Sequence, residues 1–325
     1  MKIGSVFAGI GGFDLAFQRA GCHIVWQIEI DRFCLRVLNE RFPRIKRFKD
    51  IRGIKADDLD PVDLICGGFP CQDFSTAGGR KGLGGSESGL WWQFHRLVAG
   101  LRPRWVVVEN VVGMLSSRRG WDMGAILRSL GDLGYWWAYR VLDAQWFGLP
   151  QRRKRVFVVG HIGDRTAPAK VLLEPEDCPG NTAAGREEGY EFDGAFASSV
   201  GEVGGSGLKA DTLVSHYFKG PTTAGRDSSV RNVLVDHVGV RRFTPLECER
   251  LQGFPDGWTC LCGALGNTSI CTCPHSPRYR ALGNAVAVPV VAWIARRILA
   301  HSRKEVTAAP SVRSDFFRCM NLLEN

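Results

Sequence analysis

The chain has 325 residues, of which 45% are hydrophobic, so it is long enough for one large domain or two unequal ones and too apolar for a disordered protein. Its apolar runs are shorter than the roughly 20 residues that a membrane helix needs, and its N-terminus lacks the pattern of a signal peptide, so we expect no membrane span. The formal net charge of +9 favours a polyanionic partner, although a solvated basic surface would give the same charge.

The first 160 residues alternate between strand-like and helix-like segments. Short apolar runs predict strands at residues 3–7, 23–28, 62–66, 105–108, 136–142 and 156–159. Apolar residues at helical spacing predict helices between them, at residues 13–20, 33–42, 91–101 and 124–133. This alternation is typical of an α/β fold with a Rossmann-like, doubly wound, mostly parallel sheet that is covered by helices on both faces.

Residues 161–240 break this pattern, because they are rich in Gly, Ser, Thr and Asp and their apolar runs are short. We expect a smaller, irregular, partly β domain there. Regular structure returns from Arg241, and helical spacing predicts a closing helix at residues 286–299. The predicted parts of the chain are a main domain of residues 1–160 and 276–300, an inserted domain of residues 161–275, and a polar tail of residues 301–325.

A glycine-rich turn follows the first predicted strand. Such a turn lets the backbone approach a ligand closely and begins a helix whose N-terminus attracts negative charge. Glu29, 20 residues after Gly9 at the end of the second strand, is placed to bind ribose hydroxyls. The third glycine of the dinucleotide fingerprint is missing, which fits an adenosine ligand without a pyrophosphate, such as S-adenosylmethionine, although a tight turn without a ligand is the alternative. The candidate cofactor residues are Phe7, Gly9, Gly11, Gly12 and Glu29, with Asp50 and Ile51, which precede the third strand and could instead only cap a loop.

A cysteine lies on a Gly- and Pro-broken loop directly after the third predicted strand. Residues 67–76 read G-G-F-P-C-Q-D-F-S-T, and a thiol kept for packing more often lies inside a strand than just beyond it. Ligands of such sheets bind beyond the strand ends, so we expect Cys71 to meet Glu109, which ends the fourth strand. Partial burial would raise the pKa of Glu109, whereas a solvated glutamate at a strand end is the alternative.

Basic residues precede the last strand of the main domain, in the sequence Q-R-R-K-R at residues 151–155. Alternate residues of a strand face one side, so Gln151, Arg153 and Arg155 are expected to point together. Arginines placed in this way suit planar recognition of a base edge or a phosphate, although a basic strand edge without a ligand is common. A second basic cluster lies at residues 41–55.

Together these segments resemble the C5-cytosine DNA methyltransferases. The motifs shared with that family, in the family order, are F-A-G-I-G-G at 7–12, P-C-Q at 70–72, E-N-V at 109–111, Q-R-R-K-R at 151–155, R-F-T-P-L-E-C-E-R-L-Q-G-F-P at 242–255 and R-Y-R-A-L-G-N-A-V at 278–286. The resemblance covers residues 1–160 and 240–300. It implies a DNA (cytosine-5-)-methyltransferase in which Asn284 lines the S-adenosylmethionine pocket and the inserted domain recognises the target.

The resemblance also implies a chemistry for individual residues. Cys71 would add to C6 of a cytosine flipped out of the DNA stack, because C5 is a weak nucleophile until that addition makes the ring enamine-like. Glu109 would supply a proton at N3, and Arg155 with Arg153 would hold the cytosine O2 and the adjacent phosphate. Further DNA contacts are expected from Gln72, Ser75 and Gln151.

Four of the eleven cysteines form two close pairs, Cys260 with Cys262 and Cys271 with Cys273. Two such pairs suggest a tetrahedral zinc site that braces the DNA-facing domain. One residue between the partners is tighter than the usual zinc spacing, so free thiols in a loop are the alternative, and a disulfide is less favoured. Eleven cysteines in a chain without a secretory signal indicate a reducing compartment.

These observations predict a monomeric, cytoplasmic enzyme of a prokaryote or a phage that uses S-adenosylmethionine and acts on double-stranded DNA. Three other functions stay open. An RNA methyltransferase would share the same core, and a DNA-binding protein without turnover would share the fold, although the intact Cys71 and Glu109 argue against lost turnover. A nicotinamide oxidoreductase is disfavoured because the glycine fingerprint is incomplete.

Overall fold

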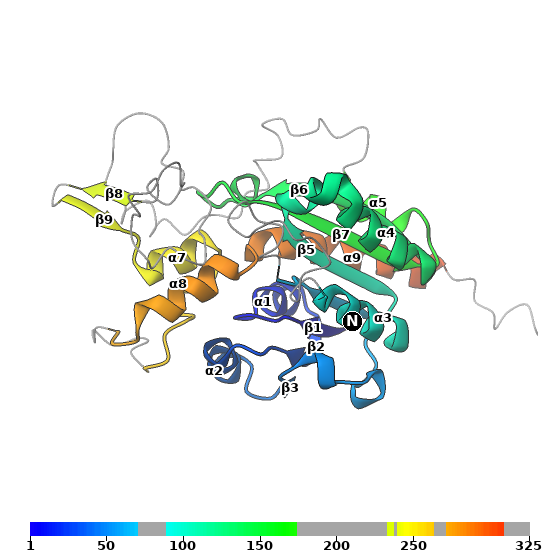
Figure 1. The fold of residues 1–325 in the computed structure, drawn as a ribbon, viewed down its shortest axis with the longest axis horizontal. Helices are drawn as coiled ribbons and strands as arrows, with labels where there is room; N and C mark the ends of the chain where they lie inside the picture. The colour runs from blue at the N-terminus through cyan, green and yellow to red at the C-terminus, as the bar shows by residue number, and fades with distance from the viewer. Residues whose placement is uncertain (71–88, 174–232, 237–238, 263–270, 309–325) are drawn as a thin grey trace, which may run out of the picture.

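The computed structural model describes residues 1–70, 89–173, 233–236, 239–262 and 271–308, whose arrangement Figure 1 shows. Within them, a seven-stranded sheet has the order β3-β2-β1-β4-β5-β7-β6, and β8 and β9 form a separate antiparallel ribbon. The strands of the sheet are β1 Lys2–Val6, β2 His23–Ile28, β3 Lys46–Phe48, β4 Leu64–Gly67, β5 Trp105–Val111, β6 Tyr135–Asp143 and β7 Lys154–Ile162. The ribbon strands are β8 Val233–Asp236 and β9 Gly239–Arg242.

The direction of β7 brings a basic segment to the ligand-binding edge of the sheet. The strands β3, β2, β1, β4 and β5 run parallel, so their carboxyl ends meet at one edge, where ligands of doubly wound sheets bind. β7 is antiparallel to both β5 and β6, so it starts at that edge. Arg155, near the start of β7, therefore pairs with Val111 at the carboxyl end of β5.

Helices cover both faces of the sheet (Figure 1). The α-helices are α1 Gly12–Arg19, α2 Arg32–Arg41, α3 Leu90–Leu101, α4 Trp121–Asp132, α5 Ala167–Leu172, α7 Pro245–Leu251, α8 His275–Asn284 and α9 Val288–Ala308. The short 3-10 helices are η1 Ile51–Gly53, η2 Ala56–Asp58, η4 Val112–Leu115, η5 Ser117–Gly120 and η6 Ala144–Phe147. Local sequence signals start several of them: Asp31 caps α2, and Thr244 forms a reciprocal capping box with Glu247 at the start of α7.

Two hydrophobic cores lie on opposite faces of the sheet. Successive side chains of a strand point to opposite faces, so in β5 Trp105 and Val107 join the core that contains α1, α2 and α9. Val106 and Val108 join the other core, which contains residues of α3 and α4. A central strand buried on both faces explains why β5 reads as a continuous apolar run rather than an alternating one.

The predicted α/β class and doubly wound sheet are confirmed, and the six predicted strands correspond to β1, β2, β4, β5, β6 and β7. β3 was not predicted, because it is only three residues long and lies in the basic cluster at residues 41–55. α5 follows the predicted end of the main domain at residue 160 and contacts β6, β7 and α9. α9 continues to Ala308, past the point at which a polar tail was expected.

The structure also bears on the expectation of no membrane span. By length and composition alone, the helical stretch His275–Arg303 could cross a membrane. However, 67% of its apolar window is buried inside the protein, and the stretch consists of two separate helices, α8 and most of α9. Burial of this kind is what a core helix of a folded domain shows.

Candidate active site

The turn between β1 and α1 has a backbone conformation that few residues adopt. Phe7, Gly9 and Gly11 have positive φ angles of 54°, 56° and 83°. A positive φ is ordinary for glycine but strained for phenylalanine, and such strain is frequent at functional sites. The N–H of Gly11 donates to the carbonyl of Ala8 at 2.8 Å, which closes the turn. The backbone therefore bends sharply at the N-terminus of α1, where a ligand can approach it.

Glu29 holds this turn against the end of β2. One carboxylate oxygen accepts the N–H of Gly9 at 2.7 Å, and the other accepts the N–H groups of Ile30 and Asp31 at 2.8 and 2.7 Å. Burial raises the pKa of the Glu29 carboxyl, and the three backbone donors oppose that rise. The side chain of Ile30 is 61% exposed beside it, an apolar surface suited to an adenine face. Ile30 was not among the predicted residues; the signal in the sequence that points to it is an aliphatic residue directly after the carboxylate at the end of a strand.

Asp50 and Ile51 lie at the start of η1, after β3. Asp50 accepts the backbone N–H of Arg52 at 3.0 Å and forms an ion pair with its guanidinium at 2.7 Å, and these contacts lower the pKa of the Asp50 carboxyl. The side chain of Ile51 is buried, and its carbonyl accepts a hydrogen bond from Arg96 at 3.0 Å. Asp50 therefore caps a turn, and the adenine contact of these two residues stays a prediction.

The segment after α8 forms a wall beside the glycine turn. A Cβ on Gly12 would lie 2.8 Å from Cγ1 of Val286, so α1 begins in direct contact with that segment. Asn284, the last residue of α8, is exposed next to this joint. The cofactor residues predicted from the two ends of the chain are thus brought together at the start of α1.

A buried carboxyl, which the sequence pattern did not single out, lies beneath the turn. Asp14 of α1 is fully buried and accepts hydrogen bonds from the hydroxyl of Ser5 at 3.0 Å and the amide of Gln27 at 2.8 Å. These contacts join α1 to β1 and β2. Burial raises the pKa of Asp14 from 3.8 to about 6, and the two side-chain donors oppose that rise.

Glu109 and Arg155 form an ion pair at the carboxyl end of β5. Nε of Arg155 lies 3.0 Å from Oε1 of Glu109, and the two side chains are 15% and 12% exposed. Burial raises the pKa of the Glu109 carboxyl, whereas the positive charges of Arg155 and Arg153 oppose that rise. The result is a carboxyl that holds its proton more tightly than an exposed glutamate does, beside a cation that can balance its charge after the proton leaves.

The chain that leads to Cys71 contacts this carboxyl. A Cβ on Gly68 would lie 2.7 Å from Oε2 of Glu109, so only glycine fits there without displacing the carboxylate. Nδ2 of Asn110 donates to the carbonyl of Phe69 at 3.4 Å, which ties the next residue to the end of β5. Three predicted residues lie outside the described part of the chain, and their roles stay predictions: Cys71, Gln72 and Ser75.

Gln151 and Arg153 are buried before the start of β7. Nε2 of Gln151 donates to the carbonyl of Leu251 at 2.7 Å, at the end of α7. Nη2 of Arg153 donates to the carbonyls of Gly283 and Ala285 at 2.9 and 2.7 Å, on either side of Asn284. These contacts join the basic segment to the elements that follow the inserted domain, and the predicted contacts of both side chains with DNA stay predictions.

Part of the basic cluster at residues 41–55 contacts backbone carbonyls of the protein itself. The guanidinium of Arg41 donates to the carbonyls of Gly257, Trp258 and Cys260 at 2.7, 2.9 and 3.1 Å. Arg47 donates to carbonyls at the end of α2. These two arginines therefore stabilise the fold, and the number of basic residues in the cluster overstates the charge available to a polyanion.

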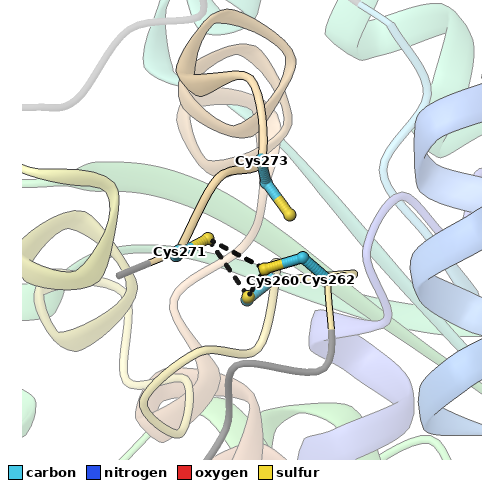
Figure 2. Close-up of side chains that lie close together, drawn as sticks. All are labelled: Cys260, Cys262, Cys271 and Cys273. Carbon is cyan, nitrogen blue, oxygen red and sulfur yellow. Dashed lines mark hydrogen bonds between the residues drawn. The ribbon is translucent and has the colours of Figure 1, made fainter. Parts of the chain in front are cut away.

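The four paired cysteines meet in space, as Figure 2 shows. All four sulfur atoms lie within 4.8 Å of one another, although eight residues of chain separate Cys262 from Cys271. All four are free thiols in the structure. Among the described residues, this is the set of side chains whose grouping fits a metal ion. The two predicted pairs are therefore brought together into one group of four sulfur atoms.

Comparison with known proteins relates this geometry to a family. The model of the C-5 cytosine-specific DNA methylase family matches residues 1–183 and 205–300. The Type II methyltransferase M2.BsuMI of Bacillus subtilis is 33% identical and covers 92% of this chain and 75% of its own length. The Type II methyltransferase M.Bsp6I of a Bacillus species is 30% identical and covers 92% of this chain and 98% of its own length.

Solved structures share the fold at low sequence identity. The Entamoeba histolytica methyltransferase EhMeth superposes with a TM-score of 0.65 and 15% identity, over 93% of this chain and 98% of its own. The Dnmt2 methyltransferase of S. pombe gives a TM-score of 0.63 and 19% identity, over 93% and 99%. The family match covers most of the chain, including the glycine turn, Glu109 and the start of β7. The chain therefore belongs to the C-5 cytosine-specific DNA methylase family and is a DNA (cytosine-5-)-methyltransferase.

Proposed function

We propose that this enzyme methylates C5 of a cytosine that is flipped out of a specific sequence in double-stranded DNA, through a covalent bond between Cys71 and C6 of the base. The observation that carries the proposal is the buried pair of Glu109 and Arg155 in contact with Gly68. Cys71 follows Gly68 by three residues, which span at most about 11 Å of chain. The nucleophile and the acid therefore belong to the same end of the sheet.

Glu109 and Arg155 suit the addition of a thiolate to cytosine. Attack of the Cys71 thiolate on C6 moves an electron pair into the ring, and a proton given to N3 by the Glu109 carboxyl neutralises it. The raised pKa of Glu109 keeps this proton available. Arg155 balances the carboxylate left behind and can offer its other guanidinium nitrogens to O2 of the ring.

The later steps complete the balance of atoms. Bound at the glycine turn, S-adenosylmethionine would supply an electrophilic methyl group: C5 of the activated ring would bond to the methyl carbon as the bond between that carbon and the sulfonium sulfur breaks, which leaves the neutral thioether S-adenosylhomocysteine. A base would then remove the C5 proton, the bond between C6 and Cys71 would break to regenerate the thiolate, and N3 would return its proton to the Glu109 carboxylate. Arg80 and Lys81, which follow in the same segment of the sequence, are basic residues that would favour the thiolate form of Cys71.

The residues around the glycine turn fit an adenosine ligand. Glu29 presents a fixed carboxylate at a strand end, which suits two ribose hydroxyls. Ile30 offers an exposed apolar face to the adenine, and Asp50 with the backbone of Ile51 would contact its edge. Asn284 and the turn itself would enclose the amino-acid part, so we assign S-adenosylmethionine to this site.

The relatives suggest the biological setting. M2.BsuMI and M.Bsp6I are Type II methyltransferases of bacteria, so we infer a Type II modification enzyme that acts in the cytoplasm of a bacterium, from a bacterial or a phage gene. We propose that it acts as a monomer and that residues 161–275 read the target sequence. The positive net charge supports a DNA partner.

Bisulfite sequencing of DNA from cells that express the chain tests the proposal. Expression of the wild type should protect cytosines within one recurrent short sequence, and Cys71→Ser should abolish the protection while binding to DNA is retained. Cys66→Ser is the matched control, because its thiol lies in β4 and contacts the carbonyl of Gly4 at 3.7 Å, a contact that a hydroxyl can also make. Normal protection by Cys71→Ser would exclude Cys71 as the nucleophile. If soluble wild-type protein protected no DNA sequence, an RNA substrate or a binding role would replace the proposal.

A further inference from the structure

We propose that Cys260, Cys262, Cys271 and Cys273 bind one structural zinc ion, which fastens the loop after α7 to the start of α8. The proposal does not depend on the methylation chemistry. It starts from the distances between sulfur atoms: Cys260 lies 3.2 Å from Cys262 and 3.1 Å from Cys271, and Cys262 lies 3.7 Å from Cys271. Cys273 completes a group whose sulfur atoms all lie within 4.8 Å of one another.

These distances fit a tetrahedron of sulfur atoms around a zinc ion. A zinc–sulfur bond of about 2.3 Å places the corners of a tetrahedron about 3.8 Å apart. The separations of 3.1, 3.2 and 3.7 Å lie below that value and the others do not exceed 4.8 Å, so small side-chain shifts would equalise them. They are much longer than the roughly 2.05 Å of a disulfide bond, so no pair is bonded.

Hydrogen-bond donors point at the sulfur atoms, as they do around thiolate ligands. The N–H of Leu261 donates to Sγ of Cys273 at 3.2 Å, and Nη1 of Arg278 donates to Sγ of Cys271 at 3.3 Å. Four thiolates around one Zn²⁺ carry two net negative charges, so a guanidinium and a backbone donor stabilise the set. Cys260 is buried and Cys262 is exposed, so an ion could enter from one side.

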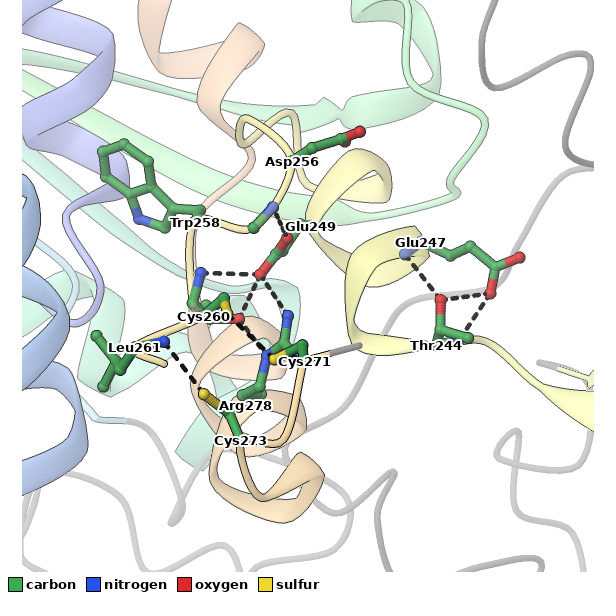
Figure 3. A network of polar contacts seen from close by, with 12 residues as sticks. Thr244, Glu247, Glu249, Asp256, Trp258, Cys260, Leu261, Cys271, Cys273 and Arg278 are labelled. Carbon is green, nitrogen blue, oxygen red and sulfur yellow. Dashed lines mark hydrogen bonds and ion pairs between the residues drawn. The ribbon is translucent and has the colours of Figure 1, made fainter. Parts of the chain in front are cut away.

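Figure 3 shows that the cysteines adjoin a buried polar network. Nη2 of Arg278 lies 3.0 Å from the Glu249 carboxylate, and Nε donates to the hydroxyl of Thr259 at 2.7 Å. Glu249 also accepts the N–H groups of Gly257 and Thr259 at 2.6 and 2.8 Å. Arg278 thus joins α7, the loop at residues 257–262 and α8, and the zinc ion would close the same joint from the other side.

This joint reaches the glycine turn. Trp258, two residues before Cys260, donates its indole N–H to the carbonyl of Ile10 at 2.8 Å. Arg41 of α2 holds the carbonyl of Cys260 itself at 3.1 Å. A metal that fixes the loop would therefore also stiffen the turn at which we place S-adenosylmethionine. In Figure 1, α7 and α8 lie beside the main sheet, at the same end of the molecule as the β8–β9 ribbon.

The metal content of full-length, tag-free protein, measured by inductively coupled plasma mass spectrometry, tests the proposal. We expect about one zinc ion per chain in the wild type. In Cys262→Ser the zinc content should be lower by roughly tenfold or more, and the fold should be kept because the exposed side chain of Cys262 contributes little to packing. Cys22→Ser, which removes a thiol outside the group, is the matched control and should retain its zinc. Cobalt-substituted wild type should show the intense visible absorption of a tetrahedral thiolate site.

Two further measurements separate a metal site from a merely structural loop. Titration of the wild type with a mercurial reagent should release about one zinc ion per chain, with no need for a variant to fold; the zinc released is the readout, because thiols outside the group, Cys71 among them, react as well. Removal of zinc by a chelator, which leaves the other thiols unmodified, should lower the thermal midpoint and weaken S-adenosylmethionine binding by about tenfold, the size of change typical of a disturbed metal site. The proposal would be overturned if the wild type contained no zinc, contained iron instead, or had disulfides among these cysteines. It would also be overturned if Cys262→Ser retained its zinc.

Discussion

Gly68→Ala should separate the catalytic role that we propose for Glu109 from the stability of the fold. The backbone of Gly68 does not have a positive φ, so alanine can adopt its conformation. The new Cβ would, however, lie 2.7 Å from Oε2 of Glu109, where an ordinary contact begins at 3.4 Å. The end of the Glu109 side chain is flexible enough to move, so the substitution should displace the carboxylate rather than the backbone.

The size of the effect follows from the geometry. The carboxylate must move by about 0.7 Å, and misplacement of a reacting group by about 1 Å can cost a hundredfold in rate. We therefore expect kcat to fall by about tenfold to a hundredfold. Movement also strains the 3.0 Å ion pair with Arg155, which holds the carboxylate on its other side. The free energy of unfolding should change by less than about 1 kcal/mol, because a flexible end gives way rather than backbone.

Transfer of a tritiated methyl group to DNA, with kcat and both KM values, measures the effect beside a thermal melt. Gly124→Ala is the matched control, since its new Cβ on α4 would have no atom within 4 Å other than its chain neighbours and the backbone of its own helix. That variant should keep full activity and gain about 0.5–1 kcal/mol of stability from the better helix former. If Gly68→Ala keeps wild-type kcat while its melt is also unchanged, the position of the Glu109 carboxylate does not govern the reaction.

Two other variants test buried polar groups. Asp14→Asn keeps hydrogen-bond partners for Ser5 and Gln27 and removes an ionisable carboxyl. In the wild type, burial raises the pKa of Asp14 from 3.8 to about 6, so the folded wild type loses stability as pH rises between these values. Urea unfolding should therefore show the variant about 3 kcal/mol more stable than the wild type at pH 7 and equal to it below pH 4, and a difference independent of pH would contradict this. Arg153→Lys keeps the positive charge but cannot make both hydrogen bonds to the carbonyls of Gly283 and Ala285, which flank Asn284. The affinity for S-adenosylmethionine, measured by calorimetry, should therefore fall about tenfold. A larger change in the KM for DNA would instead favour a contact between Arg153 and DNA.

Sequence periodicity predicted most of the main sheet because its central strands β1, β4, β5 and β7 are largely buried. The apolar run at residues 105–108 and the glycine turn at 7–12 are strong local signals, and both occur where they were expected. The sequence analysis missed β3 because two of its three residues are basic. The position of this strand depends on its pairing with β2 rather than on its own composition. A short edge strand is determined by its neighbour more than by its sequence.

The site was harder to predict where long-range contacts decide what a side chain does. Arg41 and Arg155 are both basic residues in basic segments, yet Arg41 contacts backbone carbonyls and Arg155 an acidic side chain. The antiparallel direction of β7, which places Arg155 beside Glu109, is a property of topology and leaves no local signal. Asp14 looks like an ordinary first-turn acid of a helix until β1 and β2 bury it.

The contact between Gly12 and Val286 also has a consequence for how the protein is made. Gly12 leaves the ribosome early, whereas Val286 follows after most of the chain, an interval of tens of seconds at ordinary rates of synthesis. Until α9 emerges, the apolar face that it covers over α1 is open to chaperones and to other nascent chains. The site that we propose for S-adenosylmethionine would therefore be completed near the end of synthesis, so we expect a prematurely terminated product to be inactive rather than a methyltransferase without control of its target.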